Sequence, residues 1–325
     1  MTAPNAPLLD PRERHFMIAS PNEGLRLFLR HLAPIRAAYD KRAVLYVHGA
    51  TFPSALSIAH RFDGVSWRDV LCDAGFDVWG LDFQGFGGSD RYPQMQDDAA
   101  NHPPLCDTAD ATRQVEAAVR FICEQQTLAH VSLIAHSWGS MPAASFAGAH
   151  PDRVERLVLF GPIAQRSAQG TQGPPPSPAW RIVTPAAQWE RFNEDVPAGN
   201  APPMARHSFD EWAERYLDSD TKARTRDPQG VKTPTGPFAA IVRAWNGALD
   251  YDPARVKAPV AIIRGEWDGL LPDADARWLF DAFASSPVKR DIKISEATHL
   301  MHLEAMRHAL HRESVAFLNE TMAAQ

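Results

Sequence analysis

Residues 131–139 read VSLIAHSWG, a mostly apolar run that ends in a serine, a tryptophan and a glycine. Such a run is typical of a strand that is buried on both faces of a parallel sheet. Small residues at positions 143, 144, 147 and 148 then predict a closely packed helix. Ser137 is therefore expected in a tight turn between a buried strand and a helix, where a nucleophile elbow would hold a reactive side chain.

Comparable apolar runs recur on both sides of this stretch, and helical patterns lie between them. Alternation of buried strands with helices predicts right-handed crossover units and a mostly parallel sheet. We therefore expect an α/β fold of three layers, with residues 26–31 as an antiparallel edge strand. The other expected strands are residues 44–48, 77–83, 157–160, 260–264 and 289–294, and the expected helices are residues 108–124, 276–283 and 305–318.

The alternation stops between residues 162 and 252. This segment begins with a Pro/Gly-rich loop at residues 170–178 and continues with helical patches rich in aromatic residues, without a convincing strand. We predict a core domain formed by residues 1–161 and 253–325, and a helical lid formed by residues 162–252.

The composition excludes several classes of protein. The chain has 325 residues, of which 45% are hydrophobic, so a disordered chain is not expected. Its net charge is -6 and it has no basic run, so a nucleic-acid binder is not expected either. No apolar stretch reaches the roughly 18 residues that a membrane helix needs. The start of the chain has no signal-peptide pattern, which predicts a cytoplasmic protein. No metal-ligand spacing is present, and we expect no metal site.

A serine at neutral pH needs a general base, and the base needs a carboxylate that orients it. Asp268 follows the expected strand at 260–264, and His299 follows the expected strand at 289–294. The order serine, aspartate, histidine along the chain differs from the order in the two main serine-protease folds and matches that of α/β-hydrolases. We therefore predict a catalytic triad of Ser137, Asp268 and His299.

Other side chains lie close enough in sequence to compete for these roles. His302 comes three residues after His299, but His299 is the first histidine after the strand. Glu266 and Asp273 flank Asp268, and the spacing of the glycines and the proline around Asp268 favours it over both.

The sequence resembles the α/β-hydrolase superfamily over most of its length. The resemblance rests on VHG at residues 47–49, on DFQGFGGS at residues 82–89, on the elbow at Ser137, and on the Asp268 and His299 segments. It implies a hydrolase that needs no cofactor and that binds the oxyanion of its reaction with two backbone amides.

The resemblance also implies where these two amides lie. One belongs to Trp138, directly after the serine, and the other to the loop after His48, where Ala50 is favoured over Thr51. Donors placed where negative charge develops are worth about 2.7–4 kcal/mol each. His48 is expected to brace its loop, and His136 is expected to be structural.

Narrower resemblances point to particular activities within the superfamily. The runs SWGS at residues 137–140 and HPDRV at residues 150–154 are similar to proline iminopeptidases. Those enzymes usually carry Gly-Gly-Pro-Gly after the first histidine, whereas this chain has GATFP at residues 49–53. Haloalkane dehalogenases and epoxide hydrolases use an aspartate nucleophile, so Ser137 argues against both activities.

The aromatic residues of the predicted lid have two interpretations. Most of them would form the lid's own core, while a few would make an apolar pocket over the serine. We predict as substrate-binding residues Thr51, Trp180, Trp189, Trp212 and Trp245. Acidic residues of the lid either bind a substrate ammonium or lie on solvated helix faces; they are Glu190, Glu194, Asp195, Asp210, Glu211 and Glu214.

Three functions follow as hypotheses. The first is a serine hydrolase that cleaves a small carboxylic ester through an acyl-enzyme, with the lid selecting an apolar or aromatic substrate. The second keeps the triad and acts as an amidase or iminopeptidase, a thioesterase, a C–C hydrolase or an acyltransferase. The third is a binding protein that uses the pocket as a receptor, which the intact triad disfavours. The expected partner is a small-molecule ester or amide, with no nucleic acid.

Overall fold

The computed structural model describes residues 7–36, 41–167 and 177–320. Eight strands form its central sheet: β1 (Arg14–Ala19), β2 (Arg26–Leu32), β3 (Arg42–Val47), β4 (Phe76–Asp82), β5 (Val131–His136), β6 (Val154–Phe160), β9 (Val260–Gly265) and β10 (Lys289–Ile294). They lie in the order β1-β2-β4-β3-β5-β6-β9-β10. The pairs β1–β2 and β2–β4 are antiparallel and the other neighbouring pairs are parallel, which confirms the expected mostly parallel sheet.

The antiparallel edge of the sheet has one strand more than expected. The prediction that residues 26–31 form the edge is wrong in this respect, because β1 pairs with β2 from Arg14 opposite His31 to Ala19 opposite Arg26. β1 is mostly half-buried and mixes charged with apolar residues, so its sequence carries no clean period. β2 is in consequence an inner strand and is almost fully buried.

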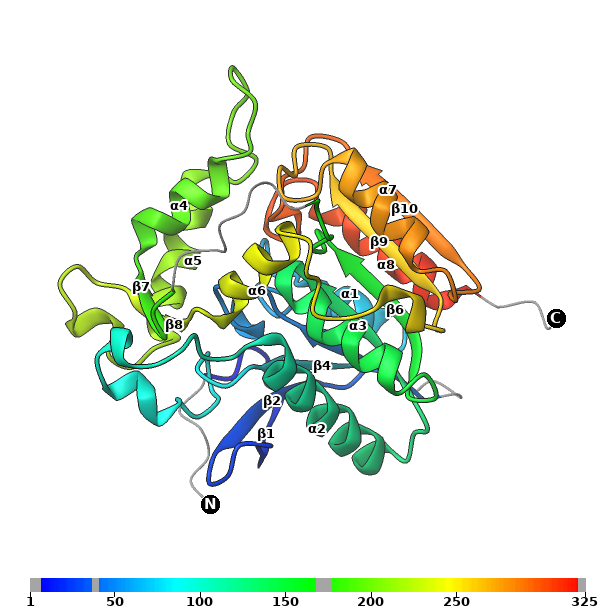
Figure 1. Ribbon diagram of the computed structural model, residues 1–325, viewed down its shortest axis with the longest axis horizontal. Helices are drawn as coiled ribbons and strands as arrows, with labels where there is room; N and C mark the ends of the chain where they lie inside the picture. Colours follow the sequence, from blue (N-terminus) through cyan, green and yellow to red (C-terminus); the bar gives the residue numbers. More distant parts are fainter. Residues whose placement is uncertain (1–6, 37–40, 168–176, 321–325) are drawn as a thin grey trace.

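Helices cover both faces of the sheet (Figure 1). They bury two separate clusters of apolar side chains. On one face lie α2 (Thr108–Gln126), α3 (Ser140–Ala149) and α7 (Asp273–Ala282), and on the other α1 (Trp67–Asp73) and α8 (Arg307–Asn319). This confirms the three-layer architecture and the three helices expected from periodicity. No helix in the described part of the chain is long and apolar enough to cross a membrane.

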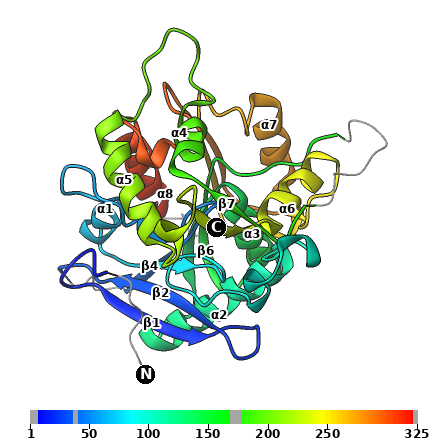
Figure 2. The same ribbon diagram turned by 90° about the vertical axis from the view of Figure 1, so that its left-hand side faces the viewer.

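We call the segment predicted as a lid, residues 162–252, the insertion; its described residues, 162–167 and 177–252, add no strand to the central sheet. Figures 1 and 2 show its first two helices together with a small ribbon on one side of the sheet. Its elements are β7 (Trp180–Val183), α4 (Pro185–Asn193), α5 (Arg206–Asp218), β8 (Val231–Pro234) and α6 (Gly236–Trp245).

The expectation that the insertion contains no strand is wrong, because β7 and β8 pair as an antiparallel ribbon. Each strand has only four residues, too few to show an alternating pattern. β8 also ends in Pro234, a residue that sheets tolerate at their edges. The expected Pro/Gly loop at residues 170–178 lies almost entirely outside the described residues.

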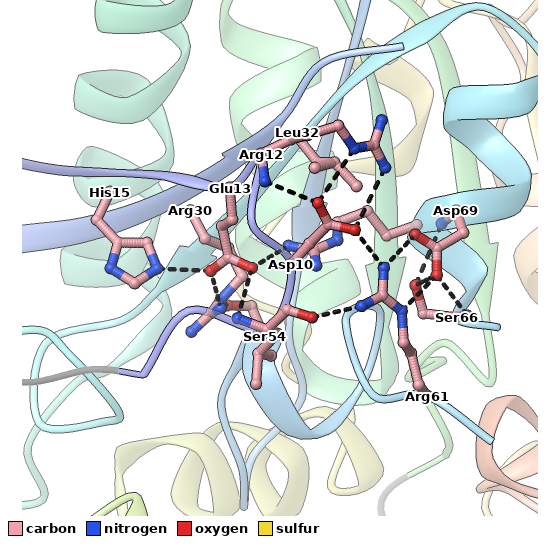
Figure 3. Close-up of polar contacts among 12 residues, drawn as sticks. Asp10, Arg12, Glu13, His15, Arg30, Leu32, Ser54, Arg61, Ser66 and Asp69 are labelled. Atoms are coloured by element: carbon pink, nitrogen blue, oxygen red, sulfur yellow. Dashed lines mark hydrogen bonds and ion pairs between the residues drawn. The ribbon is translucent and has the colours of Figure 1, made fainter. Parts of the chain in front are cut away.

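A buried group of charges joins the β1–β2 hairpin to the loop after β3 (Figure 3). The two oxygens of Glu13 lie 2.5 Å from Arg30 Nη1 and 2.7 Å from Arg68 Nη1. Arg30 Nε donates to Ser54 Oγ at 2.9 Å, and the Ser54 amide donates to Asp82 at 2.9 Å. Because Ser54 ends the loop that follows β3, this network anchors that loop to the sheet.

Candidate active site

Ser137 lies at the carboxyl end of β5, in the turn that leads into α3. Its φ of 54° is in the left-handed region that residues other than glycine rarely adopt. Strain of this kind is concentrated at functional sites. Gly139 is required in the same turn, since a Cβ there would lie 2.3 Å from the His48 carbonyl oxygen. The backbone therefore forms the elbow that the sequence predicts.

The structure brings together the three side chains that were predicted as a triad. Ser137 Oγ lies 2.7 Å from His299 Nε2, and His299 Nδ1 lies 3.0 and 3.1 Å from the two carboxylate oxygens of Asp268. All three residues are buried. In this arrangement Nδ1–H of His299 donates a hydrogen bond to Asp268, which leaves Nε2 without a proton and able to accept that of the serine.

The surroundings of Asp268 favour its ionised form. Burial alone would raise the pKa of Asp268, but the attraction and hydrogen bond of His299, with the hydrogen bond from the Leu270 amide, hold the pKa below its usual value. A charged carboxylate here can stabilise an imidazolium. Gly161 leaves room for the ring, because a Cβ at that position would lie 2.9 Å from His299 Nδ1.

The side chains that competed for the triad roles lie elsewhere. His302 is buried against His136, with ring centroids 4.6 Å apart, and neither of its ring nitrogens has a hydrogen-bond partner among the described residues. Asp273 is bound by Lys293 at 2.9 Å on the surface, and Glu266 is exposed. The geometry therefore selects His299 and Asp268.

His136 contacts the base of the predicted triad through the main chain. Its Nε2 donates to the His299 carbonyl oxygen at 3.1 Å, and its ring stacks on Phe160 at 4.3 Å between centroids. Burial lowers the pKa of His136 well below its usual value, so the ring is neutral and donates from Nε2. His136 is thus placed to position His299 rather than to exchange protons with Ser137.

The backbone groups expected to form an oxyanion hole are available for that role. Ala50 and Thr51 line the same small cavity as Ser137. Within the described residues, the amides of Ala50, Thr51 and Trp138 all donate to no acceptor, so the hydrogen bonds do not distinguish Ala50 from Thr51. The loop itself is held by His48, whose Nε2 accepts the Phe83 amide at 3.0 Å. A developing oxyanion needs two such N–H donors, and the predicted oxyanion hole stays a prediction.

The cavity at Ser137 and His299 has a volume of about 40 Å³, room for only a few water molecules. It lies where loops from the carboxyl ends of the parallel strands meet the insertion. Most of its walls are apolar, and one is cationic. Besides Ser137, the two histidines and residues 49–51 of the loop after β3, the lining residues are Phe52, Arg191, Phe238, Ile241, Leu270 and Leu300.

The four tryptophans predicted as substrate-binding residues do not line this cavity. Trp212 is fully buried in the core of the insertion, and its Nε1 donates to the Leu56 carbonyl at 2.9 Å. The other three, Trp180, Trp189 and Trp245, each lie beneath a cationic side chain. The aromatic side chains that reach the cavity are Phe52 and Phe238 instead.

A larger hollow of about 850 Å³ lies away from the triad. It is enclosed by the β1–β2 hairpin, the Gly-rich loop after β4 and the segment between α5 and β8. Two ion pairs join charged side chains of its walls, Arg26 with Asp90 and Arg226 with Asp220. None of Ser137, Asp268 and His299 lines it, so the small cavity is the candidate active site.

Glu304 is a second buried carboxylate close to the triad. It accepts the Thr298 amide at 3.0 Å and also contacts the Thr298 hydroxyl. Thr298 directly precedes His299, so Glu304 fixes the loop that carries the histidine. Burial raises the pKa of Glu304 to about 7, although the two hydrogen bonds from Thr298 oppose this.

Glu304→Gln is expected to flatten the dependence of stability on pH. The pKa of Glu304 is about 7 in the folded protein against an ordinary 4.5, so between these values the folded state holds a proton that the unfolded state has lost. The free energy of unfolding therefore falls as the pH rises through this window, by roughly 2–3 kcal/mol for this one group. Glutamine mimics the neutral carboxyl and removes that fall. Urea unfolding of both proteins at pH 5 and pH 8 measures it, and equal falls in the two proteins would contradict the prediction.

Comparison with known proteins places this geometry in a family. A family model described as alpha/beta hydrolase fold matches residues 42–305. The chain therefore belongs to the alpha/beta hydrolase fold family. Curated relatives include a haloalkane dehalogenase of Mycolicibacterium paratuberculosis, 29% identical over 203 residues, which cover 62% of this chain and 56% of the relative. A haloalkane dehalogenase of Mycobacterium marinum is 29% identical over 216 residues, 63% of this chain and 64% of the relative. Each match thus spans less than two thirds of the relative's length.

Solved structures share the fold at low sequence identity. A thioesterase domain from the curacin biosynthetic pathway has a TM-score of 0.61 at 15% identity, covering 94% of this chain and 99% of that one. A laboratory-evolved variant of potato epoxide hydrolase has a TM-score of 0.61 at 16% identity, covering 95% and 100%. A monoacylglycerol lipase of Paleococcus ferrophilus has a TM-score of 0.55 at 18% identity, covering 90% and 98%. These likenesses establish the fold, and several activities occur on it.

Proposed function

We propose that this alpha/beta hydrolase cleaves a carboxylic ester and that Ser137 is its nucleophile. The observation that supports this most is the chain of hydrogen bonds from Ser137 Oγ to His299 and on to Asp268, at 2.7 and 3.0 Å. A serine hydroxyl is a weak nucleophile at neutral pH until an adjacent base takes its proton. The three side chains are arranged for that transfer.

In the proposed reaction, Ser137 Oγ attacks the acyl carbon while His299 Nε2 takes the hydroxyl proton. The amides of Ala50 and Trp138 stabilise the oxyanion of the tetrahedral intermediate. The bond from the acyl carbon to the alcohol oxygen then breaks, and His299 returns the proton to the departing alcohol. Water attacks the acyl-serine with His299 again as the base, which releases the carboxylic acid and restores the hydroxyl. Asp268 stabilises the imidazolium in both halves.

Because the curated relatives are haloalkane dehalogenases, alkyl halides are the competing class of substrate. Displacement of a halide by Ser137 would join the serine to the alkyl group as an ether, which water does not cleave under mild conditions. A carboxylate nucleophile would leave an ester, which water can hydrolyse. The same reasoning applies to epoxides. Ser137 therefore supports acyl substrates, since only an acyl-serine allows repeated turnover.

The insertion is proposed to act as the lid that selects the substrate. α4 and α6 contribute Arg191, Phe238 and Ile241 to the walls of the cavity at the serine. Because these side chains narrow the space beside the serine, we expect the site to accept a short acyl group more readily than a long one.

A panel of substrates assayed on one preparation tests the proposal. It contains p-nitrophenyl acetate, butyrate and octanoate, L-proline p-nitroanilide, 1-chlorobutane and styrene oxide. We expect turnover of the esters, with kcat/KM falling at least about 10-fold from acetate to octanoate because each added methylene must find room in the cavity. Turnover of the halide or the epoxide without turnover of any ester would contradict the proposal.

A further inference from the structure

Arg191 of α4 is the one permanently charged side chain among the described residues that line the cavity at Ser137. The rest of the lining consists of histidines, apolar side chains and the loop after β3. A guanidinium stays protonated in proteins and carries five N–H donors in a planar fork. The cavity thus offers a fixed positive charge to a group bound beside the serine.

Most of the donors on Arg191 are unused. Nη1 contacts a carboxylate oxygen of Glu194, while Nε and Nη2 make no hydrogen bond with the described residues. The Glu194 side chain is 48% exposed, and that of Arg191 is 25% exposed. A half-exposed ion pair of this kind contributes little free energy, so an arriving anion can compete for the guanidinium.

The acidic residues near Arg191 do not take its place in the cavity. Asp195 does not line the cavity, and a Cβ on Gly269 would lie 2.5 Å from its Oδ1, so the carboxylate is packed against that loop. Burial lowers the pKa of Arg191, and the attraction of Asp195 and Asp268 opposes the change. The charged group that α4 and the turn after it present to the substrate is therefore the guanidinium of Arg191 and not a carboxylate.

We infer that the ester substrate carries a carboxylate, which accepts hydrogen bonds from the Arg191 guanidinium while Ser137 attacks the ester carbonyl. The inference rests on the proposed function, because it names the class of substrate for the same site. The guanidinium fork matches a carboxylate in a bidentate pair. Ser137 and Arg191 line the same small cavity, so a short spacer between ester and carboxylate suffices. The proposed substrate is therefore the hemiester of a short dicarboxylic acid, and a substrate with a free ammonium is disfavoured.

Two esters of similar length test this inference. Ethyl hemisuccinate carries a carboxylate at the end of its acyl chain, and ethyl butyrate does not; the acid released from either ester is titrated at constant pH. The measured quantity is the ratio of kcat/KM for the two esters in the wild type, in Arg191→Gln, in Arg191→Lys and in Arg206→Gln. Arg206 is a matched control because it is an exposed arginine of α5 that pairs with Asp210 and does not line the cavity.

The wild type is expected to prefer the hemisuccinate at least about 10-fold, mainly through KM. Arg191→Gln should lower the ratio by about 10- to 100-fold, which is typical when a hydrogen bond to a charged group is lost. Arg191→Lys should give an intermediate ratio, and Arg206→Gln should keep the wild-type ratio. Raising the salt concentration should raise KM for the hemisuccinate alone. The rate on butyrate in each variant reports whether the site is still assembled.

Failure of this inference differs from failure of the proposed function. If the wild type hydrolyses both esters with a ratio near one, the carboxylate inference is overturned and the ester hydrolase stands. An unchanged ratio in Arg191→Gln would overturn it as well, because another group would then bind the carboxylate. If the wild type hydrolyses neither ester, both the inference and the proposed function are overturned.

Discussion

Ser137→Ala is expected to lower kcat for p-nitrophenyl acetate by a factor on the order of 10⁴–10⁶, the loss seen when a triad nucleophile is removed. Without the hydroxyl no acyl-enzyme can form. The amides of Ala50 and Trp138 can then support only a slow direct attack of water on the ester. The fold should persist, because the one side-chain partner of the hydroxyl among the described residues is His299. Steady-state kinetics and thermal unfolding of the same preparation measure both effects.

A second serine of the same turn provides the control. Ser140→Ala removes a buried hydroxyl that accepts the Ile163 amide at 3.2 Å and makes no contact with His299. It is expected to keep kcat within a few-fold of the wild type. A folded Ser137→Ala protein with a kcat close to that of Ser140→Ala would show that ester cleavage does not proceed through Ser137.

Glu13→Ala is expected to lower the free energy of unfolding by about 3–5 kcal/mol, the usual cost of removing one partner from a buried ion pair. The substitution leaves Arg30 and Arg68, which are 2% and 1% exposed, without the carboxylate that they share. Burial would raise the pKa of Glu13, but His15 and the two arginines outweigh this and lower it to about 2. Its stabilising contribution is therefore complete at pH 7 and is lost only as the pH falls towards 2.

Urea unfolding at pH 7 tests this expectation against two further variants. Glu23→Ala removes an exposed glutamate from the turn of the same hairpin and should change stability by less than about 0.5 kcal/mol. Glu13→Gln keeps the shape and loses the charge, so its effect should lie between the two alanine variants. A loss below about 1 kcal/mol in Glu13→Ala would mean that the network in Figure 3 does not stabilise the fold as a buried ion pair does.

The central sheet and the convergence of three distant residues are predictable because each depends on a local pattern. Ser137, Asp268 and His299 each follow a short apolar run. Parallel strands bring their carboxyl ends to one edge of the sheet, so residues far apart in sequence meet there. The strain at Ser137 is likewise a property of a single turn, whereas the need for Gly139 arises where that turn meets the His48 carbonyl oxygen just after β3.

Other features could not be predicted from sequence patterns, because they depend on how one element packs against another and not on local periodicity. β1 is identifiable only by its partner β2, and the pairing of Glu13 with Arg30 and Arg68 requires the hairpin to lie against α1. The four tryptophans are natural candidates for an apolar pocket, yet the core of the insertion and the cationic side chains cover them. The place of Arg191 in the cavity could not be predicted, because it lies among acidic residues in the sequence and no local pattern tells which side of α4 meets the core.

Labelling with a fluorophosphonate probe would show whether Ser137 is the nucleophile. The probe bonds to a serine only when a neighbouring base activates its hydroxyl, and mass spectrometry of the digested protein locates the adduct. We expect one adduct per chain, on Ser137, formed together with the loss of esterase activity and absent in His299→Ala. An adduct on another residue, or full esterase activity in a protein whose Ser137 is completely labelled, would contradict the proposed role of the triad.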